Sequence, residues 1–125
     1  MDTRTQDNLS RDEIGALISS DKVDGTAVYN RKGESLGTID HLMIEKLSGQ
    51  VAYAVMSFGG FLGIGEKYHP LPWKVLDYDI TKGGYVIDCD KRTLENAPMY
   101  EGSDATSWSE RGWRKRVDEY YLPYM

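Results

Sequence analysis

The sequence predicts a mainly β fold, a small antiparallel β-barrel of the SH3-like kind that is followed by a C-terminal α-helix. Three observations lead to this prediction. Short runs with strand character alternate with glycine-containing turns between residues 23 and 88. The strongest run, VAYAVMSF at Val51 to Phe58, is rich in residues that favour strands. After Ser107, apolar side chains recur at helical spacing. Several short strands of this kind are typical of a barrel or a sandwich.

The length of 125 residues suits one compact domain, which we divide into three parts. Residues 1–20 are expected to be flexible or weakly helical, residues 21–98 to form the barrel, and residues 99–125 to form a linker and the C-terminal helix. A single cysteine, Cys89, fits a reducing compartment. The polar start does not resemble a secretory signal, and no apolar run approaches the ~20 residues of a membrane helix. We therefore expect a cytoplasmic protein without a transmembrane segment.

The N-terminal part carries a weak helical signal. Ser10 and Glu13 have the spacing of a capping box, and Ile14, Leu17 and Ile18 would then share one helical face. The extreme terminus is polar and is expected to be disordered.

The central part is predicted to consist of strands that are separated by three turns. The strands are expected at residues 26–29, 35–45, 51–58, 68–71, 75–80 and 85–88, and the turns at residues 30–33, 47–50 and 81–84. Because residues 51–58 show little polar alternation, both faces of that strand should be covered. One face would point into the barrel, and the other would need a helix or another subunit.

Helical patterns return at the C-terminus. Asp90 can cap a short helix that ends before Pro98. A second capping pattern at residues 107 and 110 precedes a longer helix, which Pro123 ends. Four residues of this helix fall on one face, namely Trp113, Val117, Tyr120 and Tyr124. We expect this face to dock on the barrel or on a partner.

The stretch GGFLGIGEKYHPLPW, Gly59 to Trp73, could suggest a phosphate-binding loop. Glu66 stands where such a loop requires lysine, and the prolines at 70 and 72 argue against the helix that should follow. A tight loop between strands is therefore the simpler interpretation. Its apolar residues, Phe61, Leu62 and Ile64, are expected to pack against a partner or a second subunit.

The candidates for catalysis and metal binding are few. His41 and His69 lack partners at metal-ligand spacing, so no metal site is expected. Cys89 lies between two aspartates, which oppose formation of a thiolate. The sequence therefore indicates no catalytic residues and no cofactor.

The charge distribution argues against a general nucleic-acid binder. The formal net charge is −5, and the part from Ser107 onward carries four basic and three acidic residues, which leaves −6 for the remainder. Aromatic and basic residues do mix in this tail, as in some proteins that bind single strands. Docking of the helix is the better interpretation, with Arg114, Lys115 and Arg116 outside the docked face and tolerant of substitution.

The chain resembles the PRC-barrel family over Val23 to Pro98. The resemblance lies in the succession G-x-x-V-Y-N-x-x-G-x-x-x-G, then G-x-x-A-Y-A-V, then P-L-P-W, and it is greatest for stand-alone bacterial members with a GGFLGIGEK-type loop. The family implies the barrel fold. Its members include the cytoplasmic domain of the photosynthetic reaction centre H subunit and a domain of a ribosome maturation factor that binds a ribosomal protein. No catalytic residue belongs to the family pattern.

The leading hypothesis is a non-enzymatic interaction module that binds a protein partner and forms a homo-oligomer. The alternative is a small-ligand or electron-transfer accessory domain that is linked to photosynthetic membranes. A weaker alternative is an enzyme that uses His69 or Cys89. The residues predicted to interact are Phe61, Leu62, Ile64, Trp113, Val117, Tyr120 and Tyr124.

Overall fold

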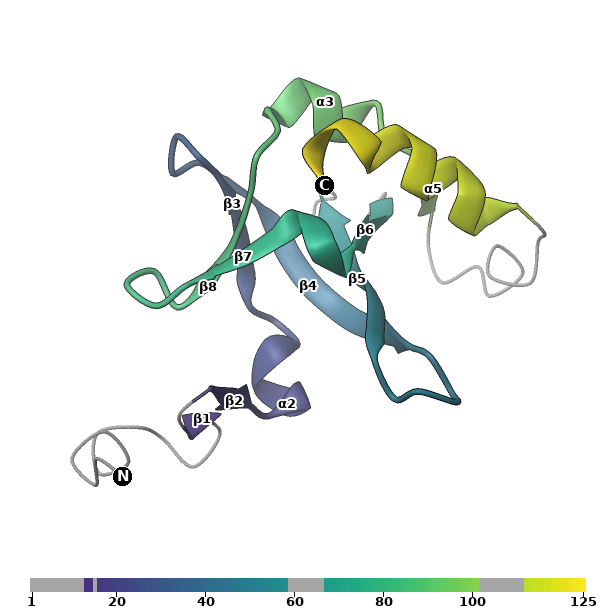
Figure 1. Cartoon of the computed structure of the whole chain (residues 1–125). Coiled ribbons are helices and arrows are strands. Elements are labelled where there is room, and N and C mark those ends of the chain that lie inside the picture. Colours follow the sequence, from purple (N-terminus) through teal and green to yellow (C-terminus); the bar gives the residue numbers. More distant parts are fainter. Residues whose placement is uncertain (1–12, 15, 59–66, 102–111) are drawn as a thin grey trace.

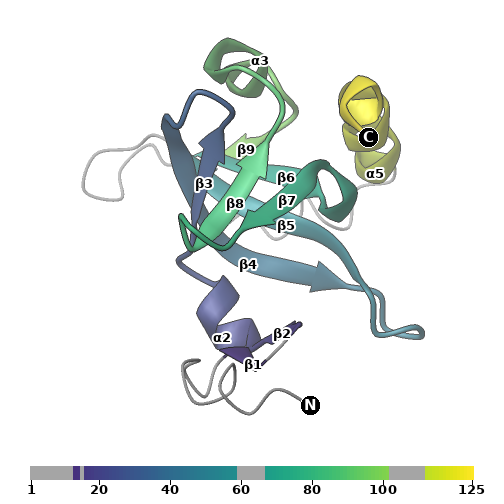
Figure 2. The same cartoon turned by 60° about the vertical axis from the view of Figure 1, so that its left-hand side comes forward.

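The structure is a computed structural model that describes residues 13–14, 16–58, 67–101 and 112–125. Its main feature is a curled seven-stranded sheet in the order β7-β8-β3-β4-β5-β6-β9, accompanied by a C-terminal helix (Figures 1 and 2). The predicted fold class is confirmed. The strands are β3 (Ala27–Asn30), β4 (Ser35–Ile44), β5 (Val51–Phe58), β6 (Lys67–Pro72), β7 (Leu76–Asp79), β8 (Gly84–Ile87) and β9 (Tyr100–Glu101).

The N-terminal segment pairs as a small hairpin. Strands β1 (Glu13–Ile14) and β2 (Leu17–Ile18) are antiparallel, and the short helix α2 (Ser20–Val23) follows. The weak helix predicted here is therefore wrong for the residues of β1 and β2. A capping pattern is a local signal, and an isolated short helix is only marginally stable. These elements lie at the opposite end of the sheet from helix α3 (Lys91–Glu95) in both views (Figures 1 and 2).

Among the described strands of the main sheet, one pairing is parallel, whereas the other five are antiparallel. Strand β3 lies parallel to β8, with Val28 opposite Tyr85 and Asn30 opposite Ile87. The sequence did not indicate this pairing, because turn signals report only on strands that follow one another. This pairing joins β3, at the beginning of the barrel, to β8, which comes near its end.

Strand β5 is buried on both faces, as the sequence predicted. Four consecutive residues, Tyr53 to Met56, are at most 2% exposed. Ala54 and Met56 lie on one face, and Tyr53 and Val55 lie on the other, because side chains alternate along a strand. On the neighbouring strand, Pro72 lies opposite Tyr53 and Pro70 opposite Val55. These prolines are tolerated because the described part of β9 pairs only with Lys67 and Tyr68, which leaves this stretch of β6 at a sheet edge.

The C-terminal elements form a cap beside β6. Asp90 accepts a hydrogen bond from the Thr93 backbone N–H at 2.7 Å and so caps α3, as the sequence predicted. Helix α5 (Trp113–Tyr121) lies next to β6, and the short 3-10 helix η2 (Leu122–Tyr124), which contains Pro123, follows it (Figures 1 and 2). The Tyr120 hydroxyl donates to the Thr93 carbonyl oxygen at 2.6 Å, which ties α5 to α3.

Tyr121 provides a test of this packing. Its side chain is fully buried, burial raises the pKa of its phenol well above the usual value, and its hydroxyl has no hydrogen-bond partner among the described residues. Tyr121→Phe should therefore raise the free energy of unfolding, by about 1 kcal/mol, because an unpaired buried hydroxyl is costly. Urea denaturation at neutral pH measures this change. A clear loss of stability would mean that the hydroxyl has a partner.

Candidate functional site

Helix α5 docks on its own chain. Val117 and Tyr121 are 2% and 0% exposed, and Trp113, Tyr120 and Tyr124 pack against the same core while remaining partly accessible. Three of the four C-terminal residues that were predicted to interact come from α5, Tyr124 comes from η2, and all four pack against the core of their own chain. Tyr121 was missed, although its position four residues after Val117 placed it on the same helix face.

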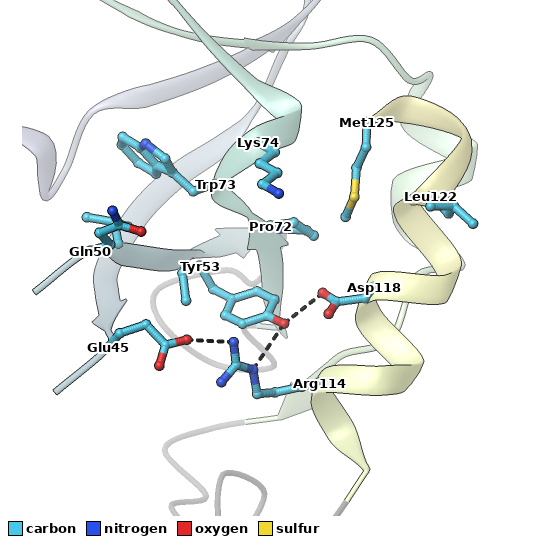
Figure 3. Close-up of a pocket in the computed structure, with 12 residues that line it drawn as sticks. Glu45, Gln50, Tyr53, Pro72, Trp73, Lys74, Arg114, Asp118, Leu122 and Met125 are labelled. Carbon is cyan, nitrogen blue, oxygen red and sulfur yellow. Dashed lines mark hydrogen bonds and ion pairs between the residues drawn. The ribbon is translucent and has the colours of Figure 1, made fainter. Parts of the chain in front are cut away.

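The contact between α5 and β5 centres on Tyr53. Its ring lies 5.0 Å from that of Trp113, measured between centroids. Its hydroxyl donates to Asp118 Oδ1 at 2.7 Å and accepts from Arg114 Nε at 3.3 Å, while Arg114 Nη2 donates to Glu45 Oε1 at 2.7 Å (Figure 3). The helix therefore covers the Tyr53 face of β5 with aromatic packing and a connected polar network.

The network changes the acidity of its members. Burial raises the pKa of Tyr53, and Asp118 adds to this effect while Arg114 opposes it. The hydrogen bonds to Tyr53 and Glu45 raise the pKa of Arg114. Tyr53 therefore remains a neutral donor and Arg114 remains a cation at physiological pH. The expectation that Arg114 lies outside the docked face is wrong, because its guanidinium bridges the helix and the sheet.

A cleft of about 610 Å³ opens beside this network, between α5 and the region where β5 begins and β6 ends. We call it the helix cleft. In Figure 3, Lys74 and Met125 project into the space between Trp73 and the helix. The helix cleft is lined by Glu45, Gln50, Val51, Ala52, Tyr53, Pro72, Trp73, Lys74, Arg114, Asp118, Leu122 and Met125.

The helix cleft combines apolar walls with accessible polar groups. Trp73 is half-buried, since its ring packs 5.4 Å from that of Tyr85, and it begins the 3-10 helix η1 (Trp73–Val75). Met125 and Leu122 are large apolar residues that are 49% and 66% exposed. A volume within roughly 300–1,000 Å³ is typical of ligand pockets. Sequence patterns did not indicate this site, because its walls come from segments that are distant in the chain.

The loop residues predicted to interact, Phe61, Leu62 and Ile64, lie outside the described residues. The described residues on either side of this segment are Phe58 and Lys67, which pair with each other at the end of β5 and the start of β6. Residues 59–66 therefore join β5 to β6 at the end of the hairpin that lies opposite to the helix cleft.

His69 is buried in the core of the sheet. It is 0% exposed, its ring lies edge-on to Phe58 at 5.7 Å, and neither ring nitrogen has a partner among the described residues. Burial, with a smaller effect of Lys67, lowers the pKa of His69 to about 4. The imidazole is therefore neutral at physiological pH and acts as a core side chain.

Cys89 is a free cysteine with little exposure. Burial raises the pKa of its thiol to about 11, and Asp90 and Asp88 add to the effect. It lies after β8, whereas His69 lies within β6. The thiol is protonated at physiological pH and is poorly suited to act as a nucleophile.

Among the described residues, no group of three or more His, Cys, Asp or Glu side chains could hold a metal ion. The described helices include none that is both long and apolar enough to cross a membrane.

Comparison with known proteins identifies a family. The model of the PRC-barrel domain matches residues 17–94. A similar solved structure is that of RimM from Pseudomonas aeruginosa, described as a 16S ribosomal RNA processing protein, with 23% sequence identity and a TM-score of 0.40. The similarity covers 67% of this chain and 50% of that one, so the chain spans half of the length of that protein. No curated protein matches the chain.

The network at Tyr53 predicts different effects for two neighbouring cations. Arg114→Ala should lower the free energy of unfolding by about 1 kcal/mol, because it leaves Glu45 unpaired and removes a hydrogen bond from the buried Tyr53 hydroxyl. Lys115→Ala is the matched control, since its pair with Glu119 spans 3.9 Å on the exposed face, and it should change stability by less than about 0.5 kcal/mol. Chemical denaturation measures both. Equal effects would contradict a special role of Arg114.

His69 predicts a pH dependence of stability. The folded-state pKa of about 4 lies below the ordinary value of 6.5, so the unfolded chain binds a proton first as the pH falls. The stability that depends on a neutral His69 is therefore fully present above about pH 6.5 and is lost as the pH falls towards 4. Between pH 7 and pH 4.5 the wild type should lose about 2 to 3 kcal/mol more than His69→Leu. Parallel pH profiles for the two proteins would show that His69 does not titrate in this way.

Proposed function

The chain belongs to the PRC-barrel domain family, and on this premise we propose that it is a non-enzymatic module that binds a protein partner, including a second copy of itself, in the helix cleft. The barrel and helix α5 act together as one unit, because α5 supplies one wall of this cleft and packs into the common core.

One observation carries the proposal, namely the combination of apolar walls and fixed polar groups in the helix cleft. Exposed large apolar side chains at a hollow surface favour a protein partner, because a partner would remove them from water. Met125 contributes such a side chain and Trp73 contributes an aromatic surface. Arg114 and Asp118 are held in place by Tyr53, so their orientation is set before a partner arrives.

The state of the two candidate catalytic residues supports a role without catalysis. A neutral, fully buried His69 and a protonated Cys89 lie on different elements and are poorly placed for acid–base or nucleophilic chemistry. The free cysteine also fits a reducing compartment, and we place the proposed role in the cytoplasm.

Substitution in the helix cleft tests the proposal. Met125→Glu places a charge on the apolar wall, and Lys74→Glu reverses the charge at the rim. Ile80→Glu is the control, because Ile80 is 86% exposed and follows β7, outside the cleft. Proteins retained from a native lysate by the wild type should also be retained by Ile80→Glu and should be lost with Met125→Glu.

Self-binding is measured in the same set of proteins by light scattering over a range of concentrations. The cleft variants should weaken it, whereas Ile80→Glu should not. If Met125→Glu and Lys74→Glu bind every retained protein and associate with themselves as strongly as the wild type does, the helix cleft is not the binding surface.

A further inference from the structure

We propose that the segment that fills the helix cleft is residues 59–66 of a second copy of this chain, so that copies join head to tail. This inference rests on the proposed self-binding and adds the occupant of the cleft and the geometry of the assembly. Its support comes from charge, from apolar character and from the reach of the segment.

The helix cleft offers one cation that is not already paired within the described residues. Arg114 binds Glu45, and Asp118 accepts the hydrogen bond of Tyr53. Lys74 is exposed, and none of the ion pairs formed in the described part of the chain includes it. A complementary occupant therefore carries apolar side chains for the walls and one acidic group for Lys74.

The segment Gly59 to Glu66, GGFLGIGE, has this composition. It carries three large apolar residues, Phe61, Leu62 and Ile64, and a single charged residue, Glu66. Its apolar residues match the wall formed by Pro72, Trp73 and Met125, and its acidic residue matches Lys74. An apolar core with a charged rim is the usual arrangement of a specific interface.

The segment is too short to fill the cleft of its own chain. The cleft begins at the pair of Tyr53 and Pro72, five residues along the strand from the pair of Phe58 and Lys67 where the segment is anchored. Five strand residues span about 17 Å. Leu62 is four residues from Phe58, so its backbone reaches at most about 14 Å from that anchor. The three apolar residues therefore enter a helix cleft together only in another copy.

This geometry makes the contact heterologous, because one copy supplies the segment and the other supplies the cleft. The two surfaces lie at opposite ends of the β5–β6 hairpin, so each bound copy keeps its other surface free, and the dimer as a whole still offers one segment and one cleft. Heterologous contacts of this kind form rings when the rotation closes and open chains when it does not.

A mixing experiment tests the inference directly. Phe61→Asp damages the segment and keeps the cleft, whereas Met125→Glu damages the cleft and keeps the segment. Each variant alone should associate roughly 10- to 100-fold more weakly than the wild type, because a buried apolar side chain is lost. An equimolar mixture should form a one-to-one dimer at the wild-type affinity, seen by light scattering as twice the monomer mass. Formation of this dimer also shows that both variants are folded.

A charge exchange provides a second measurement that does not disturb the apolar residues. Glu66→Lys and Lys74→Glu should each weaken association by about two- to five-fold, as expected for an exposed ion pair. The chain that carries both substitutions should recover the wild-type affinity.

The possible outcomes separate this inference from the proposed function. A wild type that remains monomeric at high concentration would overturn both this inference and self-binding. If Met125→Glu abolishes association but Phe61→Asp does not, binding in the helix cleft stands and the named occupant is wrong. If both variants abolish it and both remain folded by circular dichroism, yet their mixture stays monomeric and the charge exchange fails, the head-to-tail contact is wrong.

Discussion

Strand β5 is buried on both faces, and on the Tyr53 face helix α5 provides the cover. The Trp113 ring packs at a tilt against the Tyr53 ring, and Asp118 and Arg114 satisfy the hydroxyl that this burial would otherwise leave unpaired. This arrangement positions the helix, and the helix in turn forms one wall of the cleft. The proposed binding surface is thus a consequence of how the central strand is covered.

The need of buried polar groups for hydrogen-bond partners also affects other residues of the core. Asn30 is 2% exposed, but its side-chain oxygen accepts hydrogen bonds from the backbone of Lys32 and Glu34, so its burial is compensated. His69 and Tyr121 have no such partners among the described residues. These two side chains therefore add volume and apolar contact to the core while their polar atoms oppose folding.

Local signals in the sequence predicted much of the fold. The even apolar character of residues 51–58 indicated a strand that is covered on both sides, and Asp90 indicated the start of a helix. The N-terminal hairpin and the parallel pairing of β3 with β8 were not predicted. Both depend on which partner a strand finds, and propensity and turn residues carry little information about that choice.

The helix cleft was harder to predict than the fold. The helical stripe from Trp113 onward did indicate a docked face, but Tyr53 and Asp118 are 65 residues apart and meet only after the chain has folded. Arg114 was expected to lie outside the docked face, since spacing along a helix does not show that Glu45 and Tyr53 stand opposite it. Sequence periodicity predicts which face is buried, whereas the partners on that face are set by the tertiary fold.

The distance in sequence between Tyr53 and helix α5, which covers it, also affects folding during synthesis. During synthesis, β5 leaves the ribosome well before residues 113–121 exist. At roughly 5–20 residues per second, the 65 residues between Tyr53 and Asp118 take about 3 to 13 s to synthesise. Throughout that interval the Tyr53 and Val55 face lacks the helix that later covers it. The nascent chain therefore passes through a stage that favours aggregation, and molecular chaperones bind exposed apolar strands of this kind.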